Sequence, residues 1–345
     1  HVLKEQGKLN DALKMYNKAI SLKPDFASAR WNRALTLLLT GNFEQGWKDY
    51  DYRFLVKDLG FRVLSGACWD GSNLNGKTIL VHAEQGVGDT FQFIRFLPMV
   101  KKQGGHVIFE CTRNLSPLLK NCKGFDEITE RGADNNPAVS YDVHIPLLSL
   151  PKLFGIPPAS IPDAVPYIKA DPELARKWRT RITSLVSNCR LANDFPFRIG
   201  IVWAGNPTHG NDKNRSCSLA DFEPLKEIHD TVLLSLQKGN AALQLDKPPE
   251  GMSIINLDNE INSFSDTAAI IFNLDLVLTV DTAVAHLAGA IGKDVWTLLP
   301  YLPDWRWSLS GTDSPWYPGM KLYRQHKPGD WASVIKCVAD DLKRR

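Results

Sequence analysis

The chain has 345 residues, a net charge of +3, 43% apolar residues and 23% charged residues, values that are ordinary for a globular protein. At about 150 residues per domain, this length predicts two or three domains. The longest basic run is three residues at the carboxyl end, so nothing favours nucleic-acid binding. No apolar run approaches the roughly 20 residues of a membrane-spanning helix, and no signal-like segment stands at the start, so we expect a cytoplasmic protein without a membrane span.

Six cysteines are scattered along the chain, and none forms a CxxC pair or a Cys/His cluster with zinc spacing. Reduced thiols in a cytosolic protein are the simplest interpretation of this distribution. The sequence also lacks a DxD triad near a strand end. We therefore expect no metal and no cofactor.

Residues 1–56 predict helices of a tetratricopeptide repeat. Glycine and tyrosine recur with a shift of 34 residues, as Gly7 with Gly41 and Tyr16 with Tyr50. About one and a half repeats cannot bury their apolar faces on one another, so we expect further repeats upstream. A generic helical hairpin is the alternative interpretation.

Residues 57–76 are rich in loop-forming residues and predict a joint. In residues 77–190, strand-like runs alternate with helix-like runs, beginning with the strand Thr78 to Ala83 and a helix over Phe91 to Lys102. Alternation at this spacing predicts a parallel, doubly wound sheet. This segment is the first predicted α/β domain.

Residues 191–328 predict a second α/β domain. It begins with the apolar strand Phe197 to Val202 and includes another at Leu276 to Val280. The last segment, residues 329–345, contains an amphipathic helix from Trp331 to Lys343. That helix is a candidate to cross back to the first sheet.

Each predicted domain contains one polar loop between a strand and a helix. The first loop, Glu84 to Asp89, follows Thr78 to Ala83, and the second, Asp281 to His286, precedes a helix over Leu287 to Ile291. Such loops lie at the carboxyl edge of a parallel sheet, where a helix start offers unpaired N–H groups and a positive dipole end. The two loops are about 190 residues apart and predict two domains that face one cleft.

Motifs in these loops resemble those of the ADP-heptosyltransferases of lipopolysaccharide synthesis. Gly88-Asp89 stands before a helix that ends in Leu97-Pro98, and Asp281-Thr282 is followed by His286 to Ala288. The resemblance implies an α/β fold of GT-B architecture, with two Rossmann-like domains facing a cleft. In that arrangement the first domain is on the acceptor side and the second binds the nucleotide sugar.

The resemblance covers about residues 77–345. Ile199 to Gly205 matches the middle motif of the family more loosely. With repeats in front, the whole chain looks like bacterial tetratricopeptide–glycosyltransferase fusions and, more distantly, like the protein O-GlcNAc transferase. The chain departs from the heptosyltransferases at Ala283, where they usually carry glycine, and at Asn214 to Cys217, where they carry a Lys-x-Trp-Pro run. These departures leave the sugar and the nucleotide open.

Asp89 is the candidate general base for the acceptor hydroxyl. Its neighbours Gly86 and Gly88 permit unusual dihedral angles and a close approach of the backbone. An ordinary helix cap would also explain an aspartate at this position. We favour the catalytic interpretation because of the flanking glycines and the resemblance.

The donor nucleotide sugar is assigned to a second set of residues: Gly88, Arg215, Gln237, Lys238, Asp281, Thr282, Ala283, Val284 and His286. Thr282 to Val284 would supply N–H groups and a hydroxyl to the diphosphate, and Asp281 would cap the helix or orient His286. Arg215 and Lys238 would provide positive charge to the leaving diphosphate. The resemblance to O-GlcNAc transferase adds Gln237. A core histidine and solvated surface cations are the alternatives.

The cluster Trp305-Arg306-Trp307, with Trp316-Tyr317 nearby in sequence, could stack on a sugar or a base. Tryptophan and tyrosine close to proline and glycine more often pack loops against one another. We therefore predict packing.

Taken with the resemblance, these features predict an inverting, metal-independent glycosyltransferase. Its partners would be a nucleotide-sugar donor and a protein, peptide or glycan acceptor captured by the repeat segment. One alternative is a catalytically inactive scaffold that still binds a nucleotide sugar. Another is a nucleotide-sugar 2-epimerase, which would need a carboxylate constellation that we do not find.

Overall fold

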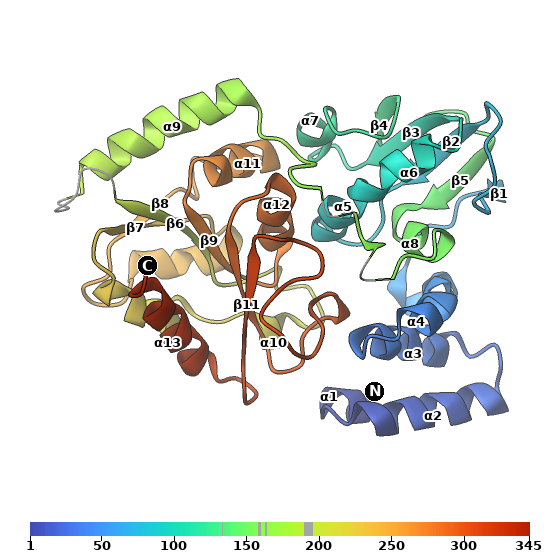
Figure 1. The fold of residues 1–345 in the computed structure, drawn as a ribbon, viewed down its shortest axis with the longest axis horizontal. Helices are drawn as coiled ribbons and strands as arrows, with labels where there is room; N and C mark the ends of the chain where they lie inside the picture. The colour runs from blue at the N-terminus through green and yellow to red at the C-terminus, as the bar shows by residue number, and fades with distance from the viewer. Residues whose placement is uncertain (133, 158–159, 163, 190–195) are drawn as a thin grey trace. The chain divides into compact units, whose positions relative to one another are not determined.

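A computed structural model describes residues 1–132, 134–157, 160–162, 164–189 and 196–345. The chain divides into two compact units, whose elements are labelled in Figure 1. Unit 1 comprises residues 1–164 and 302–311, and unit 2 comprises residues 165–301 and 312–345. The predicted boundary between residues 190 and 191 lies outside the described residues. Across the described part of the chain, we find no helix with the length and apolar character to cross a membrane.

Unit 1 begins with helices in the order expected of a tetratricopeptide repeat. They are α1 (Val2–Glu5), α2 (Leu9–Leu22), α3 (Ala27–Leu39) and α4 (Phe43–Tyr50), followed by the 3-10 segments η1 (Asp51–Leu55) and η2 (Lys57–Leu59). Gly7 and Gly41 lie two residues before α2 and α4, with φ angles of 73° and 83° that favour glycine. The 34-residue period therefore repeats a backbone conformation as well as a residue type.

A five-stranded parallel sheet forms the second part of unit 1. Its strands are β1 (Ala67–Cys68), β2 (Thr78–His82), β3 (His106–Cys111), β4 (Glu127–Glu130) and β5 (Val143–Pro146), in the order β1-β5-β2-β3-β4. The helical elements between and after them are α5 (Val87–Phe93), η3 (Ile94–Phe96), α6 (Leu97–Lys101), α7 (Ser116–Leu119), η4 (Leu147–Ser149) and α8 (Leu150–Leu153). The direction of winding reverses between β2 and β5, so this pair marks the topological switch point.

The helix predicted over Phe91 to Lys102 differs from the observed one in two ways. It starts earlier, at Val87, and it is divided into α5, η3 and α6. Pro98 explains the division, because it has no N–H to donate to the carbonyl of Ile94 one turn before. The earlier start places Gly88 and Asp89 inside the first turn of α5 rather than in the loop before it.

Unit 2 contains a six-stranded parallel sheet. Its strands are β6 (Phe197–Val202), β7 (Thr231–Ser235), β8 (Ile254–Asn256), β9 (Leu276–Val280), β10 (Val295–Leu299) and β11 (Met320–Arg324), in the order β11-β10-β9-β6-β7-β8. Strand order of this kind is that of a doubly wound Rossmann fold, with its switch point between β6 and β9. Strand β11 was not predicted, because its pattern MKLYR is short and mixes apolar with basic residues.

Helical elements cover both faces of the unit 2 sheet (Figure 1). They are α9 (Pro172–Ser187), α10 (Asp212–Arg215), η6 (Leu219–Glu227), η7 (Gly239–Asp246), α11 (Phe264–Phe272), α12 (Ala283–Ile291) and α13 (Trp331–Leu342). Helix α12 contacts β9 and β10, and α11 packs between α12 and α9. Helix α9 begins behind an Asp171 cap that accepts the N–H groups of Glu173 and Leu174.

The expectation that the carboxyl-terminal helix crosses back to the first sheet is wrong. Helix α13 buries Trp331, Ile335 and Val338 in the core of unit 2, together with residues of β6, β9 and η6. Its apolar stripe is satisfied there because the last strand, β11, ends only a few residues before it.

A different segment returns to unit 1, namely residues 302–311 with the short helix η8 (Trp305–Trp307). Trp305 is 3% exposed, and its ring lies 5.4 Å from that of Trp47 and 6.2 Å from that of Tyr50. Phe43 and Phe93 complete this aromatic cluster at 6.3 and 6.4 Å. The tryptophan motif therefore packs as predicted, and it buries α4 of the repeat segment against the rest of unit 1.

Candidate functional site

The loop after β2 in unit 1 carries backbone strain at Gln85. This residue has a φ angle of 59°, in the left-handed region that is uncommon for side chains other than glycine, asparagine and aspartate. Gly86 has an ordinary φ of −80°, so the unusual dihedral predicted at the glycines belongs to Gln85 instead. Strained residues of this kind are held by their surroundings.

Both carboxylate oxygens of Asp89 have partners. Oδ2 accepts the N–H of Gly86 at 2.7 Å, and Oδ1 accepts a hydrogen bond from the Arg306 guanidinium. The first bond caps helix α5, as the alternative interpretation of Asp89 required. The second is an ion pair with a side chain that is only 9% exposed. A carboxylate held by two partners in this way is fixed in position at the start of α5.

Arg306 organises the surroundings of Asp89. It also donates to Gln92 Oε1 and to Asp304 Oδ1, each at 2.7 Å. The ion pairs with Asp304 and Asp89 raise the pKa of Arg306 in spite of its burial, so it stays protonated. Burial raises the pKa of the adjacent Tyr50 to about 12, so its phenol stays neutral.

Glu84, the first residue of the same loop, forms a second buried ion pair, with Arg53. Arg53, which is wholly buried, donates through Nε to Glu84 Oε2 at 3.0 Å and through Nη2 to Ser149 Oγ at 2.9 Å. Glu84 Oε1 also accepts the N–H of Leu148 at 3.3 Å, which ties the end of β2 to the segment after β5. Because Arg53 follows directly on the repeat helices, that segment is anchored in the loop that carries Asp89.

In unit 2, the predicted donor residues gather at one edge of the sheet. Val202 of β6 is in register with Thr279 of β9, and Ile201 is in register with Ser235 of β7. The loops after β9, β6 and β7 therefore leave the sheet side by side. They include the segments with Thr282, Arg215 and Gln237. This edge at a switch point is where doubly wound folds bind their ligands.

The start of α12, where a phosphate site was predicted, is a capped helix N-terminus. Thr282 is its N-cap, and its hydroxyl accepts the N–H of Val284 at 3.3 Å and contacts the Thr279 hydroxyl at 3.1 Å. Ala283 and Val284 are half-buried, so the first turn is still accessible. Asp281 immediately precedes this cap. The helix begins four residues earlier than predicted, so Ala283 to His286 belong to it.

His286 is buried at 5% exposure, and its Nδ1 lies 2.9 Å from the Tyr317 hydroxyl. The Tyr317 ring also lies over Gly289, where a Cβ would come within 2.5 Å of it. His286 and Gly289 are three residues apart and so share one face of α12. This is the arrangement of a core histidine, the alternative interpretation of this residue.

Arg215 lies against the loop after β6. A Cβ at Gly205 would come within 2.7 Å of its Nη2 atom, so glycine makes room for the guanidinium. The side chain is 15% exposed and its Nε lies 3.4 Å from Asp212 Oδ1. Asp212 Oδ1 also accepts the Ser216 hydroxyl at 2.9 Å. Arg215 is thus a positioned cation and not a solvated surface residue.

Gln237 holds the same loop through its side-chain amide. Its Oε1 accepts the N–H groups of Trp203 and Ala204, and its Nε2 donates to the carbonyls of Ala204 and Lys238. Lys238 is half-exposed and its Nζ lies 2.8 Å from Asp258 Oδ1. Of the two neighbours, Lys238 has the accessible charge and Gln237 stabilises the loop.

The sequence did not pair Arg53 with Glu84, Arg306 with Asp89 or Tyr317 with His286. Asp89 and Arg306 are 217 residues apart, and Arg53 and Ser149 are 96 apart. The single available signal was an arginine between two tryptophans, since an arginine placed in an apolar run needs a buried anion.

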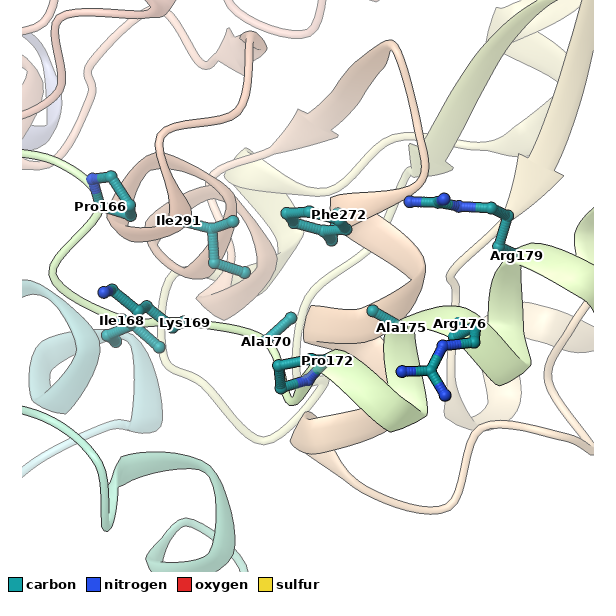
Figure 2. Close-up of a pocket in the computed structure, with 10 residues that line it drawn as sticks. All are labelled: Pro166, Ile168, Lys169, Ala170, Pro172, Ala175, Arg176, Arg179, Phe272 and Ile291. Carbon is teal, nitrogen blue, oxygen red and sulfur yellow. The ribbon is translucent and has the colours of Figure 1, made fainter.

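A cavity of about 360 Å³ lies elsewhere in unit 2 (Figure 2). It is mainly apolar, and its wall includes Phe272 and Ile291, the last residues of α11 and α12. These helix ends lie at the amino edge of the sheet, opposite Thr282. Within the described residues, no group of three or more His, Cys, Asp or Glu side chains could hold a metal ion.

Comparison with known proteins gives a tetratricopeptide repeat family model that matches residues 1–41. The chain is 24% identical to Protein FlbA of Caulobacter vibrioides over 350 residues, which covers 92% of this chain and 55% of that protein. The chain thus spans about half the length of the curated relative it matches.

Among solved structures, the chain is similar to a family 9 glycosyl transferase from Veillonella parvula, with a TM-score of 0.56 and 13% identity over 80% of this chain and 99% of the other. An ADP-heptose lipopolysaccharide heptosyltransferase II from E. coli gives a TM-score of 0.49 and 12% identity over 77% and 98% of the two chains. The first likeness shows the fold. Together with the two parallel sheets and the repeat match, it confirms the predicted class: two Rossmann-like units of the GT-B type behind tetratricopeptide helices.

Proposed function

We propose that the chain is an inverting glycosyltransferase that moves a sugar from a nucleotide-sugar donor to a hydroxyl acceptor without a metal ion. The observation that carries this proposal is the capped start of α12 at the switch point of the unit 2 sheet. The half-buried Ala283 and Val284 follow β9, and the segment with Arg215 follows β6, the strand paired with β9. Helix N–H groups with an adjacent guanidinium suit a diphosphate.

In this mechanism the acceptor oxygen attacks the anomeric carbon from the face opposite the diphosphate. Asp89 takes the acceptor proton, the bond from the anomeric carbon to the diphosphate oxygen breaks, and the nucleoside diphosphate leaves. The first turn of α12, Arg215 and Lys238 stabilise the negative charge that the leaving group gains. The ion pair with Arg306 fixes the position of the Asp89 carboxylate at the first turn of α5.

The acceptor we propose is a protein, peptide or glycan that the repeat helices help to bind. Arg53 supports this, because it joins those helices to Glu84 in the loop before Asp89. The similar structure from Veillonella parvula is a family 9 glycosyl transferase, which favours a nucleotide-sugar donor. The identity of the sugar is left open.

The variant Ala283→Pro tests how much a single backbone N–H group contributes to the diphosphate site. Proline is tolerated at the first position of a helix, and Thr282 has φ −139° and ψ 173°, which a following proline permits. Ala283→Pro should therefore preserve the fold but remove one N–H from the diphosphate site. We expect affinity for UDP, GDP or ADP, measured by calorimetry with EDTA present, to fall about tenfold or more. Ala283→Gly keeps the N–H and is the matched control.

Equal nucleotide affinity in both variants would remove α12 from the donor site. Binding that requires a divalent cation would contradict the metal-independent mechanism.

A specific observation also favours the second candidate, an inactive nucleotide-sugar-binding scaffold. Asp89, His286 and Gln237 all have protein partners that a purely structural role would explain. Donor binding without hydrolysis or transfer to any acceptor, in single-turnover assays, would favour this candidate.

A further inference from the structure

One face of the unit 1 sheet carries buried polar side chains beside apolar ones such as Leu80 and Ile108. His82 of β2 is in register with Glu110 of β3, and His144 of β5 is in register with Leu80, so both histidines and the glutamate share that face. All three are buried, Glu110 completely, and the two imidazole rings are 5.6 Å apart. A buried polar face of this kind needs hydrogen-bond partners for every group.

Two arginines reach this face but share one carboxylate. Arg62 binds Glu110 through Nη1 at 3.3 Å and also through Nη2, and it donates to the Asn135 carbonyl at 2.7 Å. Arg131 Nε lies 3.9 Å from Glu110 Oε2, which is beyond hydrogen-bond distance. Two guanidinium groups and one carboxylate leave a positive charge in excess.

The histidines do not reduce that excess. Burial lowers the pKa of His82 to about 2, with Arg62 and His144 acting in the same direction, so its imidazole is neutral. Burial also lowers the pKa of His144. Burial, with Arg62 next, lowers the pKa of Arg131, as expected of a cation without a sufficient counter-charge.

Several polar atoms of the cluster lack a partner. The Nε atoms of Arg62 and Arg131 and the Nε2 atom of His82 are shielded from solvent, and none has a hydrogen-bond partner among the described residues. His82 belongs to strand β2, so its position next to Glu110 is fixed by the pairing of β2 with β3. Unmet donors around excess positive charge indicate an anion.

We propose that Arg62, Arg131 and His82 form a partly buried binding site for an oxyanion, a carboxylate or a phosphate group, with the Arg62 and Arg131 side chains 13% and 25% exposed. Arginine suits both, because its planar N–H groups match two oxygens at once. The site is anchored to the loop that leads to Asp89, because Arg131 also donates to the carbonyl of Ala83. It does not rest on the proposed transfer reaction.

Calorimetric titration of the whole chain with inorganic phosphate and with acetate tests the site, with chloride at equal ionic strength as the reference. We expect phosphate or acetate to bind, and Arg131→Gln to weaken that binding about tenfold or more. Arg113→Gln is the matched control, since Arg113 is in the same unit, is 90% exposed and lies 3.8 Å from Glu130. It should bind the anion as the wild type does.

Glu110→Gln keeps the proposal falsifiable if Arg131→Gln does not fold. It raises the excess charge, so it should lower the melting temperature without the anion and increase the rise in melting temperature that phosphate produces. A purely structural network would show the first effect without the second. Absence of any phosphate or acetate effect beyond chloride, in the wild type and in Glu110→Gln, overturns the proposal.

Glucose 1-phosphate distinguishes a free ion from a group on a larger ligand. Binding tighter than inorganic phosphate by about tenfold would assign the oxyanion to a ligand whose sugar is also held, and equal binding would assign a free ion. Either result supports the anion site. If Ala283→Pro did not change nucleotide affinity, the donor site at α12 would be contradicted and the anion site would not.

Discussion

The loop after β2 and the loop after β9 have the same place in their sheets and are stabilised in opposite ways. In unit 1, buried arginines fix the loop: Arg53 binds Glu84, and Arg306 binds Asp89. In unit 2, the cap of the helix is made by uncharged groups, the hydroxyls of Thr279 and Thr282. Both loops end in a helix whose first turn is at the carboxyl edge of a parallel sheet.

The difference shows what each loop is suited to do. Ion pairs from distant segments hold a carboxylate in one position, which suits a group that must be aimed at an acceptor. An uncharged cap leaves the positive end of the helix dipole for a ligand, which suits an anion. Two loops of equal topology thus support different chemistry because their partners differ.

The largest effect should come from Asp89→Asn, which keeps the size of the side chain and a cap acceptor but removes the basic oxygen. We expect the single-turnover transfer rate to fall by about 10² to 10⁴, which is typical of general-base loss, with nearly unchanged donor affinity. Asp304→Asn is the control, because it removes the other carboxylate bound to the Arg306 guanidinium. An equal loss of rate in the control would assign the effect to Arg306 and not to Asp89.

Arg53→Gln should be the most destabilising change in the repeat segment. It leaves the Glu84 carboxylate, 7% exposed, without its counter-charge, which typically costs about 3 to 5 kcal/mol of unfolding free energy. Denaturant unfolding followed by fluorescence would measure it. Lys48→Gln breaks an exposed ion pair with Glu44 in the same segment and should have almost no effect.

Removing both charges of the Arg53–Glu84 ion pair tests whether the two side chains act together. The double variant Arg53→Gln with Glu84→Gln should be less destabilised than the sum of the single changes. Strict additivity would mean that the two side chains do not act as a pair.

Acid should weaken unit 1 before unit 2. The pKa of His82 is lowered to about 2 by burial, so between this value and 6.5 the unfolded chain binds a proton that the folded chain does not. Stability therefore falls as the pH drops below 6.5, by about 2 kcal/mol between pH 7 and pH 5. Hydrogen exchange in chloride buffer should show the loss in β2 and β3 rather than in β9.

His82→Gln should flatten that dependence, since glutamine does not titrate. Parallel pH profiles for the variant and the wild type would contradict the assignment to His82.

The smallest expected effect is that of Tyr317→Phe, which removes the partner of His286 Nδ1. Loss of one buried hydrogen bond should cost about 1 kcal/mol. Tyr301→Phe, at a 47% exposed position, should cost less. If His286 is a core residue, nucleotide affinity stays the same in Tyr317→Phe, and a drop in affinity would instead place the histidine at the donor.

Much of the fold could be predicted because short stretches of sequence determine its strands and repeat helices. The strands over Phe197 to Val202 and Leu276 to Val280 have the predicted bounds, since a buried parallel strand is a continuous apolar run. The repeat helices followed from their period. Strand β11 and the break at η3 were missed, because a short mixed strand and a proline inside an apolar helix give weak or opposing signals.

The candidate site was predictable as a set of positions but not as a set of contacts. Chain order alone places Thr282 and Gln237 just after the ends of β9 and β7, and parallel pairing through β6 then brings those strand ends close. The partner of Asp89 is 217 residues away, and no local rule selects Arg306 among the many arginines of the chain. The roles of His286 and Gln237 depended on which neighbours they found.

Because residues 302–311 belong to unit 1, the order of synthesis on the ribosome affects when unit 1 can fold completely. Synthesis proceeds from the amino end, so the repeat helices and the first sheet emerge long before Trp305 and Arg306. Until then the faces of Trp47 and Tyr50 have no Trp305 to cover them, and Asp89 has no Arg306. Unit 1 therefore stays incomplete until β6 to β10 of unit 2 have been made, and its folding finishes late although its sequence begins first.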